Sequence, residues 1–578
     1  MRKGSCWSVF AVILLAGRPG LPGDFVSGPD GVVVSASRPA SEVGAEVLEQ
    51  GGNAVDAAVA TGFALAVTYP AAGNIGGGGF MVVRLPDGTA TSFDFRETAP
   101  AAAHPDMFLD EAANIDTRRI EAGYLAVGVP GTVRGLALAH ARLGRLAWRR
   151  LVEPAARLAR DGFPISGSLA AALNLELAGP MRPFPGSLAT YGKPDGTPWQ
   201  AGDRLVLPDL AETLSAIATD GPDAFYTGRI AGLIADAMAA HGGLVTQADL
   251  AGYAAKERPP VTGTFLGHDV ISMGPPSSGG PVLLAMLGMF EALGLEQLPR
   301  LSPEAIHLSA EIRRRAYLDR ARFLGDPDFS DVPTARLTSP AHARSLAATI
   351  DRHRATPSLE LGGDLVAGPD GESPETTHYS VVDAAGLAVA TTYTLEGSFG
   401  SHLVVPGTGF LLNNEMGDFN RKPGTTTLRG DIGTPANVIA PGKRMLSSMT
   451  PTIIAKDGRL VLVTGSPGGR TIINTVFDVV TGVVALGLDG RSAVDAPRFH
   501  HQWLPDRLVV EFGGIDADTR AALTALGHDV VERPPQGSAQ SIWVAPETGV
   551  PAGIADHRSP DAAAVAARSP RARAEPPR

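Results

Sequence analysis

The sequence predicts an α/β protein whose first part is rich in helices and whose second part is rich in strands. Apolar residues recur at helical spacing through residues 131–160 and in "DLAETLSAIATDG" and "RIAGLIADAMAAHGG". After Thr376, alternating strand patterns such as "THYSVVD" and "RLVLVTGS" dominate. Helices and strands that are segregated in this way can complement one another as layers of a single α/β body.

Composition supports a globular chain and argues against nucleic acid as a partner. The 578 residues are 44% hydrophobic and 19% charged, enough to build one large or two ordinary domains. The formal net charge is -11 and the sequence pI is about 5.7. Because phosphate binding favours a basic surface, this acidic balance argues mildly against nucleic acid as a partner, although it leaves room for a local basic pocket.

The first elements can be assigned in order. A strand begins at Gly31, a helix is predicted near residues 41–50, and an Ala-rich apolar helix near residues 54–67. The glycine-rich stretch "GNIGGGGF" then leads into a strand at Phe80. It fits neither phosphate-loop pattern, since those open a helix, so we interpret the glycines as positions of close backbone packing.

The later elements follow the same logic. "SSGGPVLLAMLGMFEAL" predicts a helix, and "LSPEAIHLSAEIRRRAYLDRARFLGDP" predicts a long amphipathic helix with its arginines facing solvent. A helix at "TIINTVFDVVTGVVALG" separates the strands of the second part, which resume at "LVVEFG" and "SIWVAPETG". From about Ser559 the chain is rich in Pro, Arg and Ala, which predicts disorder.

The N-terminus has the pattern of a secretory signal. Met1-Arg2-Lys3 is basic, and Trp7 to Gly17 is a short apolar run, so residues 1–23 are predicted to be a signal peptide with an approximate end. A buried N-terminal helix is the alternative. The single cysteine, Cys6, lies inside this segment, and its removal excludes disulfides and cysteine-ligated zinc. We expect an exported protein, periplasmic or secreted, without a stable membrane span.

The hairpin "TTHYSVVDAAGLAVATTYTLEG" opens on two threonines after the flexible approach "GGDLVAGPDGESPE". A threonine hydroxyl is a poor nucleophile unless a base lies beside it, and an N-terminal threonine can use its own α-amine. Thr376 becomes N-terminal only if the bond after Glu375 is cut. Its hydroxyl could attack the Glu375 carbonyl and form an ester that water opens. On spacing alone, an ordinary pair of surface-loop threonines is the more frequent explanation.

Several linked segments favour the catalytic interpretation. They are "DFRETAP", "NIGGGGF", "TTHYSVVD", "TTYTLEGSFG", "LLNNEMGDF", "PGKRMLSSMTPTI" and "TGSPGGRTIINTV". Together they closely resemble the γ-glutamyltranspeptidase (glutathione hydrolase) family, bacterial type, from about Gly31 to Arg558.

The resemblance implies an N-terminal-nucleophile hydrolase fold, an αββα sandwich formed jointly by both halves of a self-cleaved precursor. Residues 24–375 would form the large, helix-rich subunit, and residues 376–578 the small subunit that begins with the nucleophile. It also implies cleavage of γ-glutamyl amides such as glutathione, with the glutamyl group passed to water, amino acids or peptides. No metal or organic cofactor is expected.

The resemblance also assigns the site. It implies that Thr376 is the nucleophile, that Thr394 orients it, and that Gly468 and Gly469 hold the oxyanion through their backbone N–H groups. The γ-glutamyl head group carries both a carboxylate and an ammonium. For the carboxylate the resemblance implies Arg96, Ser447 and Ser448; for the ammonium it implies Glu396, Glu415 and Asp418.

Residues 422–444 match the length of the loop that covers the pocket in many bacterial members of this family. The aromatic residue expected at the tip of the loop is absent, and Arg429 stands there instead. The neighbouring His500-His501 could ligate a metal, but no H-E-x-x-H partner accompanies them, and we interpret them as a hydrogen-bonded structural pair.

Two alternatives stay open on the sequence. An acylase of the same fold, for glutaryl or cephalosporin-type substrates, is disfavoured by Glu396, Glu415 and Asp418, because a glutaryl group has no amine to hold. A non-catalytic protein that binds γ-glutamyl ligands is disfavoured by Thr376 and Thr394, since binding alone does not require them.

Overall fold

The computed structural model describes residues 24–365 and 376–568. Three features expected from the sequence lie outside the described residues: the signal peptide with Cys6, the Glu375 side of the predicted cut, and the last ten residues. No helix in the described part of the chain is long and apolar enough to cross a membrane.

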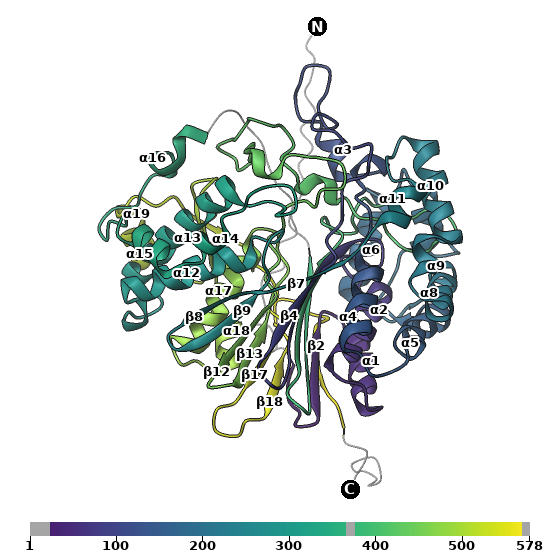
Figure 1. Ribbon diagram of the computed structural model, residues 1–578, viewed down its shortest axis with the longest axis horizontal. Helices are drawn as coiled ribbons and strands as arrows, with labels where there is room; N and C mark the ends of the chain where they lie inside the picture. The colour runs from purple at the N-terminus through teal and green to yellow at the C-terminus, as the bar shows by residue number, and fades with distance from the viewer. Residues whose placement is uncertain (1–23, 366–375, 569–578) are drawn as a thin grey trace.

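Two seven-stranded sheets lie face to face, with helices covering both outer faces (Figure 1). The first sheet has the order β1 (Phe25–Ser27), β18 (Pro551–Ile554), β17 (Ser541–Val544), β13 (Arg459–Thr464), β12 (Thr452–Lys456), β9 (His268–Ser272), β8 (Val261–Phe265). The second has the order β19 (Ala563–Ala566), β2 (Gly31–Ser35), β10 (Thr377–Asp383), β11 (Ala388–Thr394), β3 (Gly78–Arg84), β4 (Ala90–Asp94), β7 (Lys256–Arg258).

The helices divide into two groups that cover opposite faces, apart from short turns. Those drawn on the right of Figure 1 are α1 (Arg38–Glu49), α2 (Ala54–Thr68), α4 (Thr132–Leu143), α5 (Trp148–Asp161), α6 (Gly167–Ala178), α8 (Pro208–Asp220), α9 (Asp223–Tyr226), α10 (Arg229–His241) and α11 (Gln247–Gly252). Those drawn on the left are α12 (Gly279–Leu293), α13 (Pro303–Phe323), α14 (Thr334–Leu337), α15 (Pro340–Ala347), α16 (Ser358–Gly362), α17 (Thr471–Val484), α18 (Gly490–Asp495) and α19 (Ala517–Ala525).

The remaining elements are short. They are α3 (Thr117–Glu121), α7 (Pro185–Tyr191), β5 (Phe163–Pro164), β6 (Arg204–Leu205), β14 (Phe499–His500), β15 (Leu508–Glu511) and β16 (Val530–Arg533). Five 3₁₀ turns complete the described chain: Tyr124–Ala126, Leu295–Gln297, Gly363–Leu365, Glu415–Asp418 and Pro435–Asn437.

Side chains of the central strands alternate between the two sides of each sheet, so they contribute both to a core between the sheets and to cores beneath the helices. Alternate residues such as Val32, Val34 and Val382 pack between the sheets against Ile453 and Val463 of the facing sheet. The intervening residues face the helices, because successive side chains of a strand point to opposite sides. Both sides of β10 and β11 are therefore buried, and every residue of the two strands is buried, including their threonines and serine.

Helix α2 shows how local sequence sets an element. Asn53 accepts from the backbone N–H groups of Val55 and Asp56, and the Asp56 carboxylate accepts from Asn53 N, which completes a capping box. All 15 residues of the helix are buried. A helix that is apolar on every side is stable only inside the protein, and α2 packs between β10 and the helices α1 and α5.

The prediction of solvent-facing arginines on α13 is wrong. Arg313 and Arg315 are buried, and Arg313 pairs with Asp478 at 2.6 Å. Arg315 pairs with the buried Glu311 at 2.5 Å. Carboxylates from α13 itself and from α17 make this burial possible, because a buried charge needs an ionic partner.

The predicted disorder from about Ser559 is wrong for residues 563–566, which form β19. This strand pairs antiparallel with β2, and Ala563 is fully buried. Ser41 of α1 donates to the Ala563 carbonyl oxygen at 2.9 Å. Alanines that look featureless in the sequence fit here because the strand lies tightly against α1 and β18.

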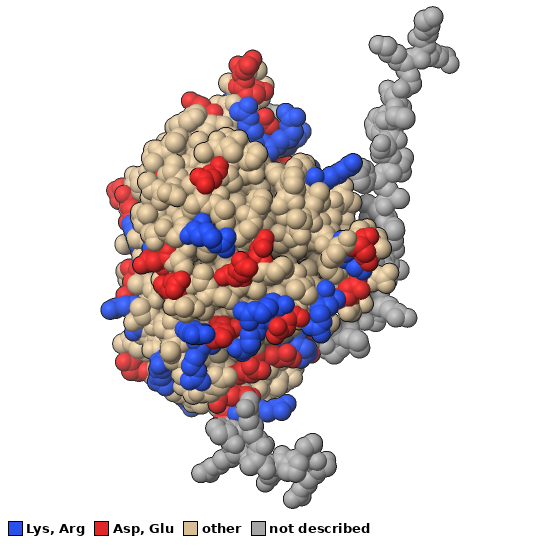
Figure 2. Space-filling view, turned by 90° about the vertical axis from the view of Figure 1, so that its right-hand side faces the viewer, with Lys and Arg blue, Asp and Glu red and all other residues tan. Residues whose placement is uncertain are grey.

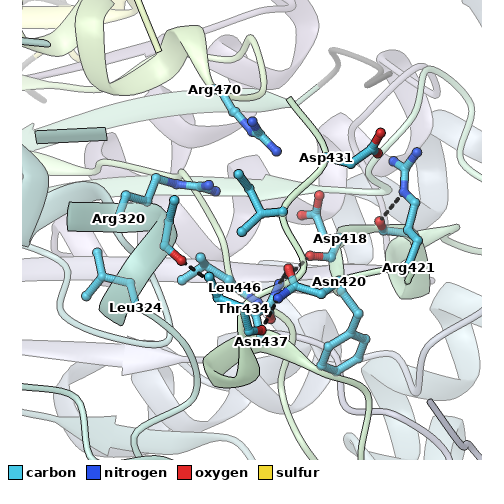
Figure 3. A pocket seen from close by; sticks show the side chains of 14 residues that line it. Arg320, Leu324, Asp418, Asn420, Arg421, Asp431, Thr434, Asn437, Leu446 and Arg470 are labelled. Atoms are coloured by element: carbon cyan, nitrogen blue, oxygen red, sulfur yellow. Dashed lines mark hydrogen bonds between the residues drawn. The ribbon is translucent and has the colours of Figure 1, made fainter. Parts of the chain in front are cut away.

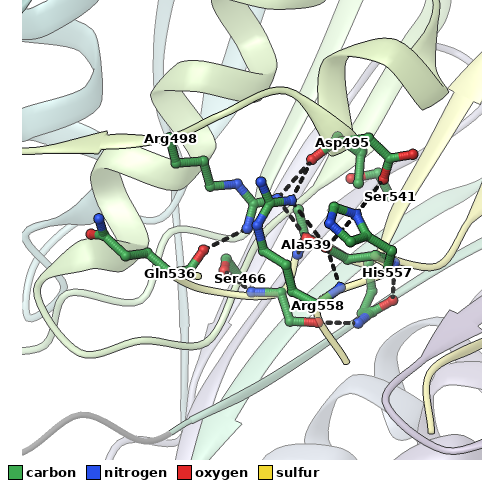
Figure 4. A network of polar contacts seen from close by, with 12 residues as sticks. Ser466, Asp495, Arg498, Gln536, Ala539, Ser541, His557 and Arg558 are labelled. Carbon is green, nitrogen blue, oxygen red and sulfur yellow. Dashed lines mark hydrogen bonds and ion pairs between the residues drawn. The ribbon is translucent and has the colours of Figure 1, made fainter. Parts of the chain in front are cut away.

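A polar network connects the C-terminal segment to the turn that precedes the glycine pair (Figure 4). Asp556 accepts from Arg498 at 2.5 Å and from the backbone N–H of Ala539 at 2.7 Å. Ser538, the residue directly before Ala539, donates its backbone N–H to Ser466 Oγ at 2.9 Å. These bonds position the segment that leads into Gly468.

On the face shown in Figure 2, Lys and Arg side chains are interspersed with Asp and Glu, without a large area of one sign. This face therefore has no continuous basic area of the kind that nucleic acid binding favours.

Candidate active site

Two threonines lie opposite each other at the ends of neighbouring strands. Thr376 directly precedes β10, and Thr394 is the last residue of β11. In this antiparallel pair Thr377 lies opposite Tyr393, so the same register extended by one residue places Thr376 opposite Thr394. Both threonines are buried, and both line one pocket of about 450 Å³. The structure thus brings together the two threonines that the sequence analysis paired.

The pocket gathers nine of the ten residues that the sequence analysis assigned to catalysis and substrate binding. Its lining consists of Arg96, Arg320, Thr376, Thr394, Glu396, Glu415, Asp418, Ser447, Ser448, Met449, Gly469, Arg470 and Ile472. These residues come from distant parts of the chain, and the sandwich brings them together at one end of β10 and β11.

The tenth residue, Gly468, lies beside the pocket in the turn that opens α17. Its φ is +127°, and that of Gly469 is +54°, values that a side chain rarely permits. A Cβ atom at Gly468 would lie 2.4 Å from Thr471 Oγ1. The turn therefore requires glycine, and it stands at a helix N-terminus, where backbone N–H groups favour negative charge.

Arg96 lies in the wall of the pocket with its guanidinium held by acids. It donates to the Glu415 and Asp418 carboxylates, and its side chain is completely buried. Burial by itself would lower the pKa of Arg96, but the adjacent carboxylates of Glu415 and Asp418 raise it. Arg96 therefore stays charged and organises the two acids that the sequence analysis assigned to the substrate ammonium.

Glu97 is a residue of this cluster that the sequence analysis missed. It is fully buried, and Arg96 Nη1 lies 3.7 Å from its carboxylate. Burial raises the pKa of Glu97 to about 7 and raises the pKa of Glu415 well above its usual range. The charge of Asp418 adds to the rise at Glu97, and the charge of Glu97 adds to the rise at Glu415, so the carboxyl groups of this cluster titrate together. The only signal for Glu97 in the sequence was its position next to Arg96 in "DFRETAP".

Arg320 is the second residue that was missed. From α13 it donates to Ser278 Oγ at 2.9 Å and to Ser448 Oγ at 3.0 Å. It thereby orients one of the two predicted carboxylate-binding serines and adds a positive charge to the pocket wall. The interpretation of α13 as solvent-exposed concealed this arginine.

A second cavity of about 500 Å³ adjoins the catalytic pocket (Figure 3). The two share Arg320, Asp418 and Arg470. Residues 422–444, which we call the lid, supply Asp431, Ile432, Thr434 and Asn437 to its wall. Arg429 is exposed on the lid and lines neither cavity.

The histidine pair is part of the interior. His500 contacts Asn474 at 2.5 Å and Gln502 at 2.8 Å, while His501 contacts Asp506 at 3.1 Å. Burial lowers the pKa of His500 to about 3 and that of His501 to about 4.

Another group, His307, Glu311 and His528, has ligand-type atoms close together. Its two histidines are already hydrogen-bonded at 2.8 Å and Glu311 is paired with arginines, so these contacts explain the group.

Two face-to-face sheets with helices on both outer sides, and a threonine at the head of a central strand, define the class of N-terminal-nucleophile hydrolases. This confirms the expected fold class. Residues 40–566 match the family model described as Gamma-glutamyltranspeptidase. The chain belongs to the γ-glutamyltranspeptidase family, and is thus an enzyme of the γ-glutamyltransferase type, as the resemblance implied.

Comparisons with individual relatives support the same family. The chain is 47% identical over 536 residues to a glutathione hydrolase proenzyme of Escherichia coli (strain K12), covering 93% of this chain and 92% of that protein. Its fold is similar to a cephalosporin acylase from Bacillus halodurans, with TM-score 0.82, 25% identity, and coverage of 96% and 99%. It is also similar to the Helicobacter pylori γ-glutamyltranspeptidase, with TM-score 0.55, 43% identity, and coverage of 58% and 96%.

Proposed function

We propose that the protein is a self-processing γ-glutamyl hydrolase and transferase that cleaves glutathione and other γ-glutamyl amides. The observation that carries this proposal is the position of Thr376, opposite Thr394 and in one pocket with both acidic and basic side chains. The E. coli relative, at 47% identity, is a glutathione hydrolase proenzyme. A signal peptide in residues 1–23 would make the enzyme periplasmic or secreted.

The first reaction is self-cleavage. The Thr376 hydroxyl oxygen attacks the carbonyl carbon of Glu375 and the C–N bond breaks, which leaves Glu375 as an ester on Thr376 Oγ and frees the Thr376 amine. Water then opens the ester and releases the carboxylate of Glu375. The products are the proposed large subunit, residues 24–375, and the small subunit, residues 376–578, which share the sandwich.

Turnover uses the same oxygen. The free amine of Thr376 takes the hydroxyl proton while Oγ attacks the γ-carbonyl carbon of the substrate. The N–H groups of Gly468 and Gly469 are proposed to stabilise the oxyanion, and their turn is shaped for this close approach. The leaving amine takes the proton, and a γ-glutamyl ester remains on Thr376. Water or the amine of an acceptor then attacks this ester and restores the hydroxyl.

The pocket suits a zwitterionic head group. We propose that Glu396, Glu415 and Asp418 attract the ammonium, and that Ser447 and Ser448 donate to the carboxylate. Arg96 already donates to Glu415 and Asp418 through separate nitrogens, so we assign it the task of holding these acids and adding positive charge. Arg320, through Ser448, supplies a further positive charge near the carboxylate.

A glutaryl or cephalosporin-type acylase is the second candidate, since a cephalosporin acylase shares the fold. A glutaryl group has no ammonium, and in such an enzyme Glu415 and Asp418 would have no cation of the substrate to bind. A non-catalytic binding protein is the third candidate, and it requires the chain to remain uncut.

The test compares purified wild type with Thr376→Ala on a denaturing gel, with N-terminal sequencing of the smaller band. Thr377→Ala, at the next buried position of the same strand, is the matched control. We expect two bands for the wild type and the control, with the wild-type small band beginning Thr-Thr-His-Tyr, and one band for Thr376→Ala.

Release of aniline from γ-glutamyl anilide, compared with glutaryl anilide, then separates transferase from acylase. A single stable wild-type band would favour the binding protein.

A further inference from the structure

Arg470 has no part in the proposed mechanism, yet it follows the glycine pair directly and lines both cavities. Its Nη1 donates to the carbonyl oxygen of Gly430 in the lid at 2.8 Å. Its own carbonyl oxygen accepts from the Tyr317 hydroxyl of α13. The backbone of Arg470 is thus held in place by α13 while its side chain reaches the lid.

The opposite end of the lid is attached to the turn that carries the ammonium-binding acids. Asn437 Nδ2 donates to the Asp418 carbonyl oxygen at 2.7 Å, and Asn437 Oδ1 accepts from Leu446 N at 2.8 Å. Asn420 N donates to the Asn437 carbonyl oxygen at 2.9 Å. The lid therefore runs from the head-group end of the site to the glycine turn.

Bonds inside the lid make it a compact unit. Gly424 N donates to the Gly433 carbonyl oxygen at 2.8 Å, and Thr427 N donates to that of Asp431 at 2.9 Å. A Cβ atom at Gly433 would lie 2.2 Å from Thr425 N, so the two sides of the lid are in direct contact. Because the lid is internally bonded, releasing its far end would move several lid residues together rather than one.

We propose that Arg470 is a positioning residue that latches the lid through Gly430 and thereby sets how the γ-glutamyl ester is divided between water and an acceptor amine. This rests on the proposed function. In either branch the attacking oxygen or nitrogen bonds to the ester carbonyl carbon, the bond to Thr376 Oγ breaks, and Oγ regains its proton. A latched lid limits the entry of water, whereas an acceptor amine can be retained in the cavity that the lid borders.

The first experiment removes the latch with Arg470→Met. The readout is the ratio of glycylglycine transfer product to free glutamate, with γ-glutamyl anilide as donor. We expect this ratio to fall about fivefold, and tryptic cleavage after the exposed Arg429 to accelerate about tenfold, effects of the size of one lost hydrogen bond. Arg507→Met, at a surface arginine with 52% of its side chain exposed, is the control and should match the wild type.

The second experiment displaces the latch from the lid side. Gly430 has φ +113°, and a Cβ atom there would lie 2.9 Å from the Leu504 carbonyl oxygen and 3.4 Å from Arg470 Nη1. Gly430→Ala should reproduce the fall in the transfer ratio without changing Arg470. Gly424→Ala is its matched control, because Gly424 also has a positive φ, +76°, but nothing lies within 4 Å of the added atom.

The double variant Gly430→Ala/Arg470→Met should show no larger effect than either single variant, since both break one contact. Independent, additive effects would overturn the latch. A transfer ratio that stays at the wild-type value in both single variants, with or without faster lid cleavage, would also overturn it. If the wild type releases no aniline at all, the proposed function fails and the division of the ester fails with it, while lid cleavage still reports whether Arg470 holds the lid.

Discussion

The guanidinium of Arg96 and the carboxylate of Glu415 form an ion pair inside the pocket wall, with the two side chains 0% and 1% exposed. Asp418 accepts from another nitrogen of the same guanidinium, and Glu97 lies nearby. One arginine thus lies against three carboxyl groups, two of which have raised pKa values. The head-group pocket is therefore a charged cluster that folding must stabilise before any substrate binds.

Replacing Arg96 by Met should destabilise the protein as well as weaken substrate binding. Removing one partner of a buried ion pair leaves uncompensated charge, which typically costs about 3–5 kcal/mol. Urea unfolding followed by circular dichroism measures this change. Arg229→Met, at a surface arginine with 56% exposure, should change the free energy of unfolding by less than about 0.5 kcal/mol. A similarly small change at Arg96 would contradict the role given to the cluster.

Glu97 should make stability depend on pH. Burial raises its pKa from 4.5 to about 7 in the folded state, so between these values the folded protein binds more protons than the unfolded chain. Stability from this group is then present below about pH 4.5 and is lost as the pH rises to about 7, on the order of 3 kcal/mol. Glu97→Gln should remove this loss. Urea midpoints at pH 5 and pH 7.5 give the comparison, and parallel changes for the two proteins would refute it.

Asp418→Asn should reduce kcat/KM for γ-glutamyl anilide by roughly 10- to 100-fold, because one charged hydrogen bond to the ammonium contributes about 1.5–3 kcal/mol. Any residual activity on glutaryl anilide should stay unchanged, since that substrate has no ammonium. Steady-state kinetics on both substrates with one enzyme preparation provides the internal control. An equal loss on both substrates would show that Asp418 acts on the fold of the pocket and not on the ammonium.

Removing β19 should expose the edge of β2. A chain that ends at Ser559 loses the strand and the hydrogen bond from Ser41 to Ala563, whereas a chain that ends at Arg568 keeps both. We expect the shorter chain to melt at a temperature several degrees lower and to aggregate, because an uncovered strand edge pairs with other chains. Differential scanning calorimetry and light scattering distinguish the two. Equal melting temperatures would mean that β19 contributes nothing to the sheet.

Helices and strands that depend on a local sequence pattern could be predicted from the sequence. The periodicity of residues 54–67 anticipated α2 to within one residue, and the alternation around Thr376 anticipated β10 and β11. The glycine pair was assigned through the resemblance to one family, since on its own a pair of glycines is better explained as an ordinary turn. The residues proposed as the nucleophile, its partner and most of the head-group pocket were assigned from linked segments that resemble one family.

Burial and pairing were decided only by the tertiary structure. The arginines of α13 have the helical spacing of a solvated face, and carboxylates from α13 itself and from α17 make their burial stable. The alanines of β19 have too little side chain to show which surface they cover. The contact between Arg470 and Gly430 joins residues 40 positions apart through a side chain and a backbone carbonyl, which leaves no pattern in the sequence. The sequence by itself determined the local elements, because these depend on neighbours in the chain, and its linked segments led to the proposed nucleophile through their resemblance to one family. Charge partners, the final strand and the attachment of the lid depend on distant residues, and only the folded chain brings those together.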